Sequence, residues 1–157
     1  MNENEMKLII ELVPSTSWYD NLRNCVSRQD WDKIRKKAYA DTNHRCEICG
    51  EKTQLHCHEK WNYNDEKRLQ KLDGFEAICV NCHMIKHAGF SMHTEEGRRK
   101  FNRDELINHF CKVNNCSRND FLKHEEEAFE IWRERSQYQW EVDLGEYKEV
   151  VKSVQKR

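Results

Sequence analysis

The hydrophobic and polar positions before residue 44 predict one apolar segment and one helix. Residues 7–13 (KLIIELV) form an apolar run that indicates a strand or a buried segment, and Pro14 ends it. Ser27 stands three residues before Asp30, which is the spacing of a helix N-cap and its partner. A helix is therefore expected to begin near Ser27, with Ile34 on its apolar face.

After residue 91 the pattern is mostly helical. Residues 94–113 carry a patchy apolar face at helical spacing. Ser117 and Asp120 form a capping-box pattern that predicts the start of another helix. Residues 138–144 alternate apolar and polar side chains, which predicts a short strand. A last helix is expected to carry Tyr147, Val150, Val151 and Val154.

The cysteines and most histidines gather in residues 44–90, and this centre divides the chain into three parts. Residues 1–43 predict a strand and a helix that pack on the centre, and residues 91–157 predict a helical C-terminal extension. A chain of 157 residues can bury a modest core, so we expect the three parts to form one compact domain.

Composition and charge exclude some classes of partner. The formal net charge is -1, so the chain as a whole has no attraction for a polyanion, and any anion-binding surface must be local. The first residues lack the basic and then apolar pattern of a signal peptide, and no apolar run approaches the roughly 20 residues that span a bilayer. We therefore expect a cytoplasmic protein with no membrane partner.

Four of the eight cysteines form two tight pairs, Cys46 with Cys49 and Cys79 with Cys82. Two residues separate the members of each pair, a spacing that lets one backbone turn offer both sulfurs to a tetrahedral ion. Without a secretion signal, this pattern favours metal binding over disulfides. The pairs predict a structural zinc ion, which contributes on the order of 10 kcal/mol to folding.

Histidines accompany both cysteine pairs. In the run from Leu55 to Trp61, strand alternation places His56 and His58 on one face and Cys57 on the other. If a helix begins near Cys82, His83 and His87 lie one turn apart, so both imidazoles can bind one ion. The alternative is that these two histidines are polar residues on an exposed helix.

The order of these residues resembles a known family. Two Cys-x-x-Cys pairs enclose a hairpin that carries a histidine, and the second pair runs into His-x-x-x-His. Over about residues 44–90 the chain resembles the HNH nucleases with a ββα-metal site, particularly those stapled by a four-cysteine zinc. The resemblance implies an α+β fold, with a zinc-stapled, treble-clef-like ββα-metal core and flanking α-helices.

The resemblance also implies roles for single residues. His58 stands where the family places the base that deprotonates the attacking water. Cys57, His83 and His87 stand where the family binds a second divalent ion, such as Mg, Mn, Ni or Zn. A thiolate at Cys57 would favour Zn over Mg. The implied function is a metal-dependent endonuclease that hydrolyses phosphodiester bonds in DNA.

Basic residues near the motif are candidates for positioning DNA phosphates. They are Lys33, Arg35, Lys36, Lys37, Lys60, Lys86, Arg98, Arg99 and Lys100. The first four also fit a simple solvated helix face. Trp61 and Tyr63 fit either stacking on bases or packing in the core.

A second reading is a non-catalytic treble-clef zinc module that binds nucleic acid or a protein partner. Cys57, the near-neutral charge and the acidic residues 125–127 favour this reading. Such a module would act as a regulator or inhibitor, for instance in conflict between phage and host. Cleavage of plasmid DNA in the presence of different metals separates the two readings.

Overall fold

The computed structural model describes residues 5–17 and 22–150 as an α+β protein built on a three-stranded sheet. The strands are β1 (Leu55–Asn64), β2 (Leu69–Cys79) and β3 (Glu141–Asp143). β1 pairs antiparallel with β2, and β3 joins the other edge of β2 in parallel orientation. β1 therefore forms a free edge of the sheet.

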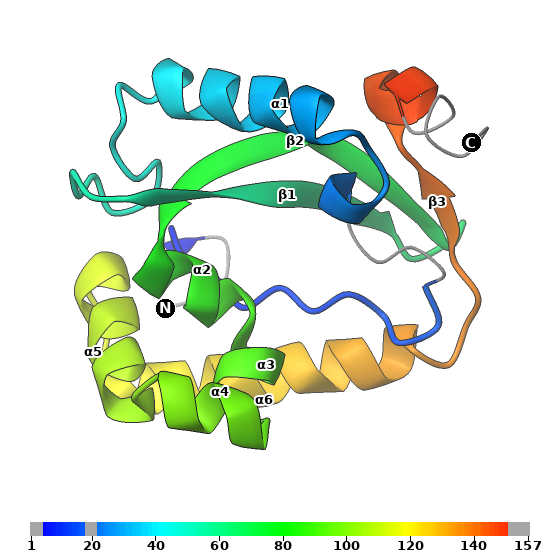
Figure 1. Ribbon diagram of the computed structural model, residues 1–157. Helices are drawn as coiled ribbons and strands as arrows, with labels where there is room; N and C mark the ends of the chain where they lie inside the picture. Colours follow the sequence, from blue (N-terminus) through cyan, green and yellow to red (C-terminus); the bar gives the residue numbers. More distant parts are fainter. Residues whose placement is uncertain (1–4, 18–21, 151–157) are drawn as a thin grey trace.

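Helices cover both faces of the sheet. The helix α1 (Arg28–Asp41) lies along one face, and the N-terminal segment and the later helices lie on the other (Figure 1). The later helices are α2 (Val80–Lys86), α3 (Ala88–Ser91), α4 (Glu95–Lys100), α5 (Arg103–Asn114) and α6 (Arg118–Arg135). Two short 3-10 helices, η2 (Leu22–Asn24) and η3 (Gly145–Tyr147), flank α1 and β3. In the described part of the chain, no helix has the length and apolar character needed to cross a membrane.

The hairpin and α2 form a continuous ββα unit. β2 ends at Cys79, and this residue is also the N-cap of α2, where its sulfur accepts the backbone N–H of Cys82. The register of β1 and β2 shifts between Lys60 and Trp61, opposite Gly74. Gly74 has a φ of 140°, a conformation that glycine adopts readily. This register shift is a β-bulge, which bends the hairpin.

Two apolar clusters fill the two sides of the sheet. The larger one joins the N-terminal segment, the hairpin base, α2, α5 and α6, with Ile85, Ile107, Phe110 and Phe121 fully buried. The smaller one, here called the α1-side core, consists of Leu22, Val26, Trp31, Leu72 and Leu144. The hairpin is held between them, and this position fixes the side chains that project from it.

Leu8 and Ile10 of the apolar segment 7–13 are buried, but the segment forms no strand. Asn114 on α5 accepts the backbone N–H groups of Lys7 at 2.8 Å and Leu8 at 3.0 Å, and it donates to the Leu8 carbonyl at 2.8 Å. His124 on α6 accepts the N–H of Ile10 at 2.9 Å. Polar side chains thus take the place of a partner strand, and the prediction of a strand is wrong for this reason.

The predicted helix starts are confirmed, while one predicted helix is divided. Ser27 caps α1, and Ser117 caps α6 in a complete capping box with Asp120. The stretch 94–113 forms two helices because Asn102 caps a new helix through the N–H of Glu105. The predicted last helix begins as η3, and Val151 and Val154 lie outside the described residues.

Candidate metal centres

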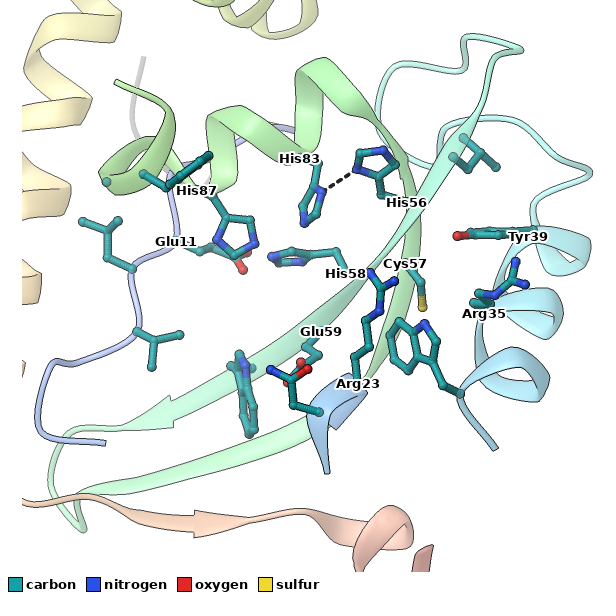
Figure 2. A pocket seen from close by; sticks show the side chains of 18 of the residues that line it. Glu11, Arg23, Arg35, Tyr39, His56, Cys57, His58, Glu59, His83 and His87 are labelled. Carbon is teal, nitrogen blue, oxygen red and sulfur yellow. Dashed lines mark hydrogen bonds between the residues drawn. The ribbon is translucent and has the colours of Figure 1, made fainter. Parts of the chain in front are cut away.

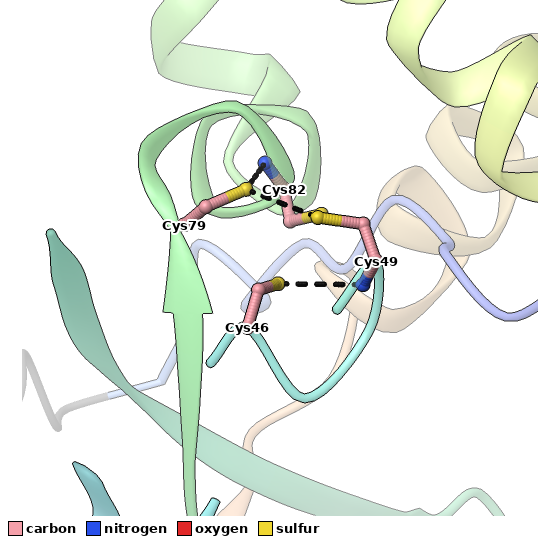
Figure 3. A group of neighbouring side chains, drawn as sticks. All are labelled: Cys46, Cys49, Cys79 and Cys82. Atoms are coloured by element: carbon pink, nitrogen blue, oxygen red, sulfur yellow. Dashed lines mark hydrogen bonds between the residues drawn. The ribbon is translucent and has the colours of Figure 1, made fainter. Parts of the chain in front are cut away.

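The four predicted cysteines converge on one point between the first knuckle and the start of α2 (Figure 3). Their sulfur atoms all lie within 4.8 Å of one another. Cys49 and Cys82 each donate a backbone N–H to the first sulfur of their own pair, at 3.4 Å. All four thiols are free of disulfides. This arrangement fits a metal ion such as zinc, with four sulfur ligands that leave no open position.

A histidine from the C-terminal extension contacts this cysteine cluster. His109 on α5 places Nε2 3.2 Å from the Cys82 sulfur. An imidazole N–H at this distance stabilises a thiolate and fixes its orientation. The contact therefore joins α5 to the centre of the fold. Sequence reasoning missed it because α5 lies well outside the motif and His109 stands in no recognisable spacing.

Three histidines form a second group, here called the tri-histidine group. His58 comes from β1, and His83 and His87 come from α2 and its C-cap. One ring nitrogen from each lies within 4.8 Å of the others. Figure 2 shows the three rings converging beside the hairpin. The i,i+4 spacing on α2 and the alternation on β1 bring them together, as the sequence predicted for His83 and His87.

Two members of the tri-histidine group, His83 and His87, favour the neutral imidazole, the form that binds metals. Burial, with the neighbouring His87, His58 and His56, lowers the pKa of His83 to about 2. Burial and the nearby His58 and Lys86 lower the pKa of His87 to about 4. Both rings therefore keep a lone pair available at neutral pH.

Hydrogen bonds orient two of these rings. His58 Nδ1 lies 3.2 Å from the Glu76 carboxylate, so an N–H on Nδ1 leaves Nε2 as the ligand atom. Although burial opposes it, the hydrogen bond from His58 and the charge of Lys86 hold the pKa of Glu76 below its ordinary value. His83 Nδ1 lies 2.8 Å from His56 Nδ1. When His83 donates this bond, its Nε2 is likewise free to act as a ligand.

The geometry gives His58 a candidate role besides that of the expected base. One of its ring nitrogens lies within 4.8 Å of ring nitrogens of His83 and His87, so the three imidazoles could hold one ion. A base separate from the metal site was expected at this residue. The ligand position follows from the face of β1 that His58 shares with His56, since that face is turned toward α2.

The structure does not bring Cys57 to the tri-histidine group. Cys57 projects from the opposite face of β1 and packs against the α1-side core, near Trp31. Burial and the charge of Glu59 raise the pKa of the Cys57 thiol to about 12, so it stays protonated. Cys57 lies on the face of β1 opposite the three imidazoles and outside their cluster, and the expectation that Cys57 completes this site is therefore withdrawn.

Substitutions of Cys57 are expected to change stability and not metal binding. Cys57→Ala should cost about 1 kcal/mol in the free energy of unfolding. Cys57→Asp should cost about 3 kcal/mol, because it places an unpaired carboxylate against the α1-side core. Urea unfolding measures the free energy of unfolding of each variant. A metal titration measures whether each variant still binds a metal ion at the tri-histidine group. Loss of the second metal in Cys57→Ala, with the fold intact, would return Cys57 to the ligand set.

Most of the basic residues predicted to bind phosphate are exposed, but they do not line the cleft beside the tri-histidine group. Lys33, Lys36 and Lys37 lie on α1, Lys60 lies on β1, and Arg98 and Arg99 lie on α4. None of them is among the residues that line the cleft described below. Lys86 differs, since it is buried and pairs with Glu11 at 2.8 Å and with Glu76 at 3.4 Å. Lys86 is therefore a structural cation, and the prediction that it binds DNA is not supported.

A cleft of about 1750 Å³ opens over the tri-histidine group. It follows the free edge of β1 and reaches from η2 and α1 to α3 and α6. Its lining includes Arg35, one of the predicted phosphate contacts, and two arginines that the sequence did not single out, Arg23 and Arg28. It also includes aromatic side chains from both ends, among them Trp31, Trp61, Tyr63, Phe90, Phe129 and Trp132. The cleft thus combines metal-binding, cationic and aromatic side chains.

Comparisons of the chain with protein-family models, with curated proteins and with solved structures found no match. The chemistry of the two clusters therefore rests on the geometry of the chain itself, namely four converging sulfurs and three converging imidazoles.

Proposed function

We propose that the protein is a metal-dependent endonuclease of the HNH type, which hydrolyses phosphodiester bonds in DNA. The observation that carries the proposal is the convergence of His58, His83 and His87 at the floor of an open cleft. The three residues lie on a ββα unit whose base holds the four cysteines. In this proposal the four cysteines hold a structural zinc of treble-clef type.

The two clusters suit different chemical tasks. Four thiolates fill the tetrahedral sphere of zinc, so the cysteine cluster has no position for a substrate. Three imidazoles leave at least one position open for water or for a phosphate oxygen. A divalent ion held there supplies a water of lowered pKa and neutralises charge on the phosphate oxygens. The cleft above the tri-histidine group gives a substrate access to this position.

The side chains around the tri-histidine group would hold it ready for an ion. Glu76 fixes the ring of His58 through Nδ1, and Lys86 keeps Glu76 ionised in a site where burial opposes the charge. His56 supports His83 from the side. Ligands fixed in this way lose little conformational entropy when they bind a metal, which favours binding.

The donor set also favours some metals over others. Imidazole nitrogen suits Zn and Ni better than Mg, which prefers oxygen ligands. The proposal therefore expects cleavage to be faster with Zn or Ni than with Mg alone. The preference comes from three nitrogens and needs no thiolate from Cys57.

Cleavage of supercoiled plasmid tests the proposal directly. Protein with its cysteine zinc in place is incubated with plasmid and with Mg, Mn, Ni or Zn in separate reactions. We expect nicked and linear products with at least one of Ni, Mn or Zn, and none after a chelator removes the added ion. If no metal supports cleavage by folded protein, the alternative of a non-catalytic zinc module replaces the nuclease.

A further inference from the structure

One cation in the cleft faces the tri-histidine group. Arg23 lies on η2, and Figure 2 shows its side chain extending along β1 toward His58. Arg23 and the three histidines of the group line the same cleft. Among the residues that the structure describes, no carboxylate forms an ion pair with Arg23, whereas Arg35 pairs with Asp32 at 2.8 Å. Arg23 is therefore a cation available to an anion in the cleft.

Aromatic side chains line the end of the cleft formed by α3 and α6. We call Phe90, Phe129 and Trp132 the aromatic strip. Phe90 is 38 % exposed, although it is a large apolar residue. The rings of Phe129 and Trp132 lie 6.3 Å apart, and the Trp132 indole N–H donates to the Val13 carbonyl at 2.9 Å. This hydrogen bond fixes the orientation of the indole at the cleft wall.

We propose that the cleft binds single-stranded DNA, with one phosphate between Arg23 and the tri-histidine group and neighbouring bases stacked on the aromatic strip. The proposal rests on the proposed function and names its substrate class. Arginine binds phosphate through paired N–H groups, and aromatic faces take unpaired bases without a sequence requirement. The two features line one cleft together with the tri-histidine group.

A duplex fits this surface less well. The ring faces of paired bases are covered by their neighbours, so an aromatic strip contributes nothing to an intact helix. Duplex binding depends on many lysine and arginine contacts to both backbones. The exposed lysines of α1 and the exposed cations of α4 lie outside the cleft lining, and α6 carries exposed Glu126, Glu127 and Glu130 beside the strip. A single strand in the cleft avoids these repulsive charges.

Binding is measured by fluorescence anisotropy, with zinc-loaded protein and no added second metal so that the strand stays intact. The probes are a labelled single-stranded DNA, its duplex and the same sequence as single-stranded RNA. We expect the single-stranded DNA to bind about tenfold tighter than the duplex and at least as tightly as the RNA. Equal or tighter binding of the duplex overturns the proposal, and tighter binding of RNA overturns the choice of DNA.

Substitutions in the cleft test the two contacts separately. Arg23→Gln removes one phosphate contact, so the slope of log affinity against log salt should become less steep by about 0.7, while Arg23→Lys should keep it. Phe129→Leu and Trp132→Leu should each weaken binding about fivefold or more. An unchanged salt slope in Arg23→Gln, or unchanged affinity in both leucine variants, overturns the proposal.

Two control variants remove the same kinds of side chain, an arginine and an aromatic ring, at positions outside the cleft. Arg118→Gln deletes an exposed arginine that pairs with Asp104, and Tyr138→Leu deletes an exposed ring, and neither residue lines the cleft. Both should bind single-stranded DNA like the wild type, and equal losses in these controls overturn the assignment to the cleft. Anisotropy measures DNA binding alone and does not depend on cleavage. A protein that binds but does not cut under any metal contradicts the nuclease and leaves the strand-binding site standing.

Discussion

Replacing Cys79 with serine is expected to unfold the protein and release its zinc. Cys79 is 1 % exposed, ends β2 and caps α2, so its sulfur joins the hairpin and the helix to the candidate zinc site. A four-thiolate zinc contributes on the order of 10 kcal/mol, and domains of this size have a total stability of about 5 to 15 kcal/mol. Losing one ligand therefore removes most or all of the margin. Circular dichroism and elemental analysis of the purified variant measure the two effects.

A second cysteine provides the control for this prediction. Cys111 lies on α5, partly buried and apart from the four-sulfur cluster, so Cys111→Ser should keep both fold and zinc. Wild-type protein purified without added metal should contain one equivalent of zinc. Folded wild type with less than about half an equivalent, or a folded Cys79→Ser variant, would remove the structural zinc from the account.

Replacing His83 with alanine is expected to reduce cleavage by roughly 100-fold or more, while the fold and the cysteine zinc remain. His83 lies at the centre of the tri-histidine group, with contacts to His56, His58 and His87. Its loss leaves two ligands, which is too few to hold a catalytic ion firmly. Cleavage rates at saturating metal and metal content after dialysis are measured on the same sample.

The variant His58→Ala tests whether His58 is a ligand of the second metal or the general base. A ligand variant loses the second metal together with activity, whereas a base variant keeps the metal and loses only the rate. We expect the first outcome, because the ring nitrogen of His58 lies with those of His83 and His87. His44→Asn is the control, since His44 lines the cleft outside the group and asparagine accepts its φ of 60°. It should cleave at nearly the wild-type rate.

Features that depend on short-range spacing could be predicted from the sequence. The two Cys-x-x-Cys pairs, the i,i+4 pair of His83 and His87, and the helix N-caps at Ser27 and Ser117 all follow from neighbours on one turn or helix. Backbone geometry fixes such neighbours without help from the rest of the chain. These cysteine and histidine pairs, which are candidate metal ligands, could therefore be predicted from the sequence.

Cys57 shows how a role carried over by position can conflict with local geometry. Strand alternation placed Cys57 on the face opposite His56 and His58, and the structure agrees with this prediction. The motif nevertheless assigned Cys57 to the same metal as His83. The geometry of the strand decides, because a side chain on the far face of a sheet cannot reach the ion.

Other features depend on residues far away in the chain. Segment 7–13 is apolar enough for a strand, but its backbone is satisfied by Asn114 and His124. The sequence predicts that Lys86 is a phosphate-binding cation, but in the structure Lys86 pairs with Glu11 and Glu76. No pattern around such residues identifies their partners, since tertiary packing alone brings them together.

The central claim is that the protein holds two metal ions in sites of different chemistry, a closed four-sulfur site and an open three-nitrogen site. Anomalous diffraction from a crystal grown with excess zinc tests it most directly. We expect one peak about 2.3 Å from the sulfurs of Cys46, Cys49, Cys79 and Cys82, and a second about 2.0 to 2.1 Å from nitrogens of His58, His83 and His87. A peak at the cysteines with none at the three histidines would contradict the claim.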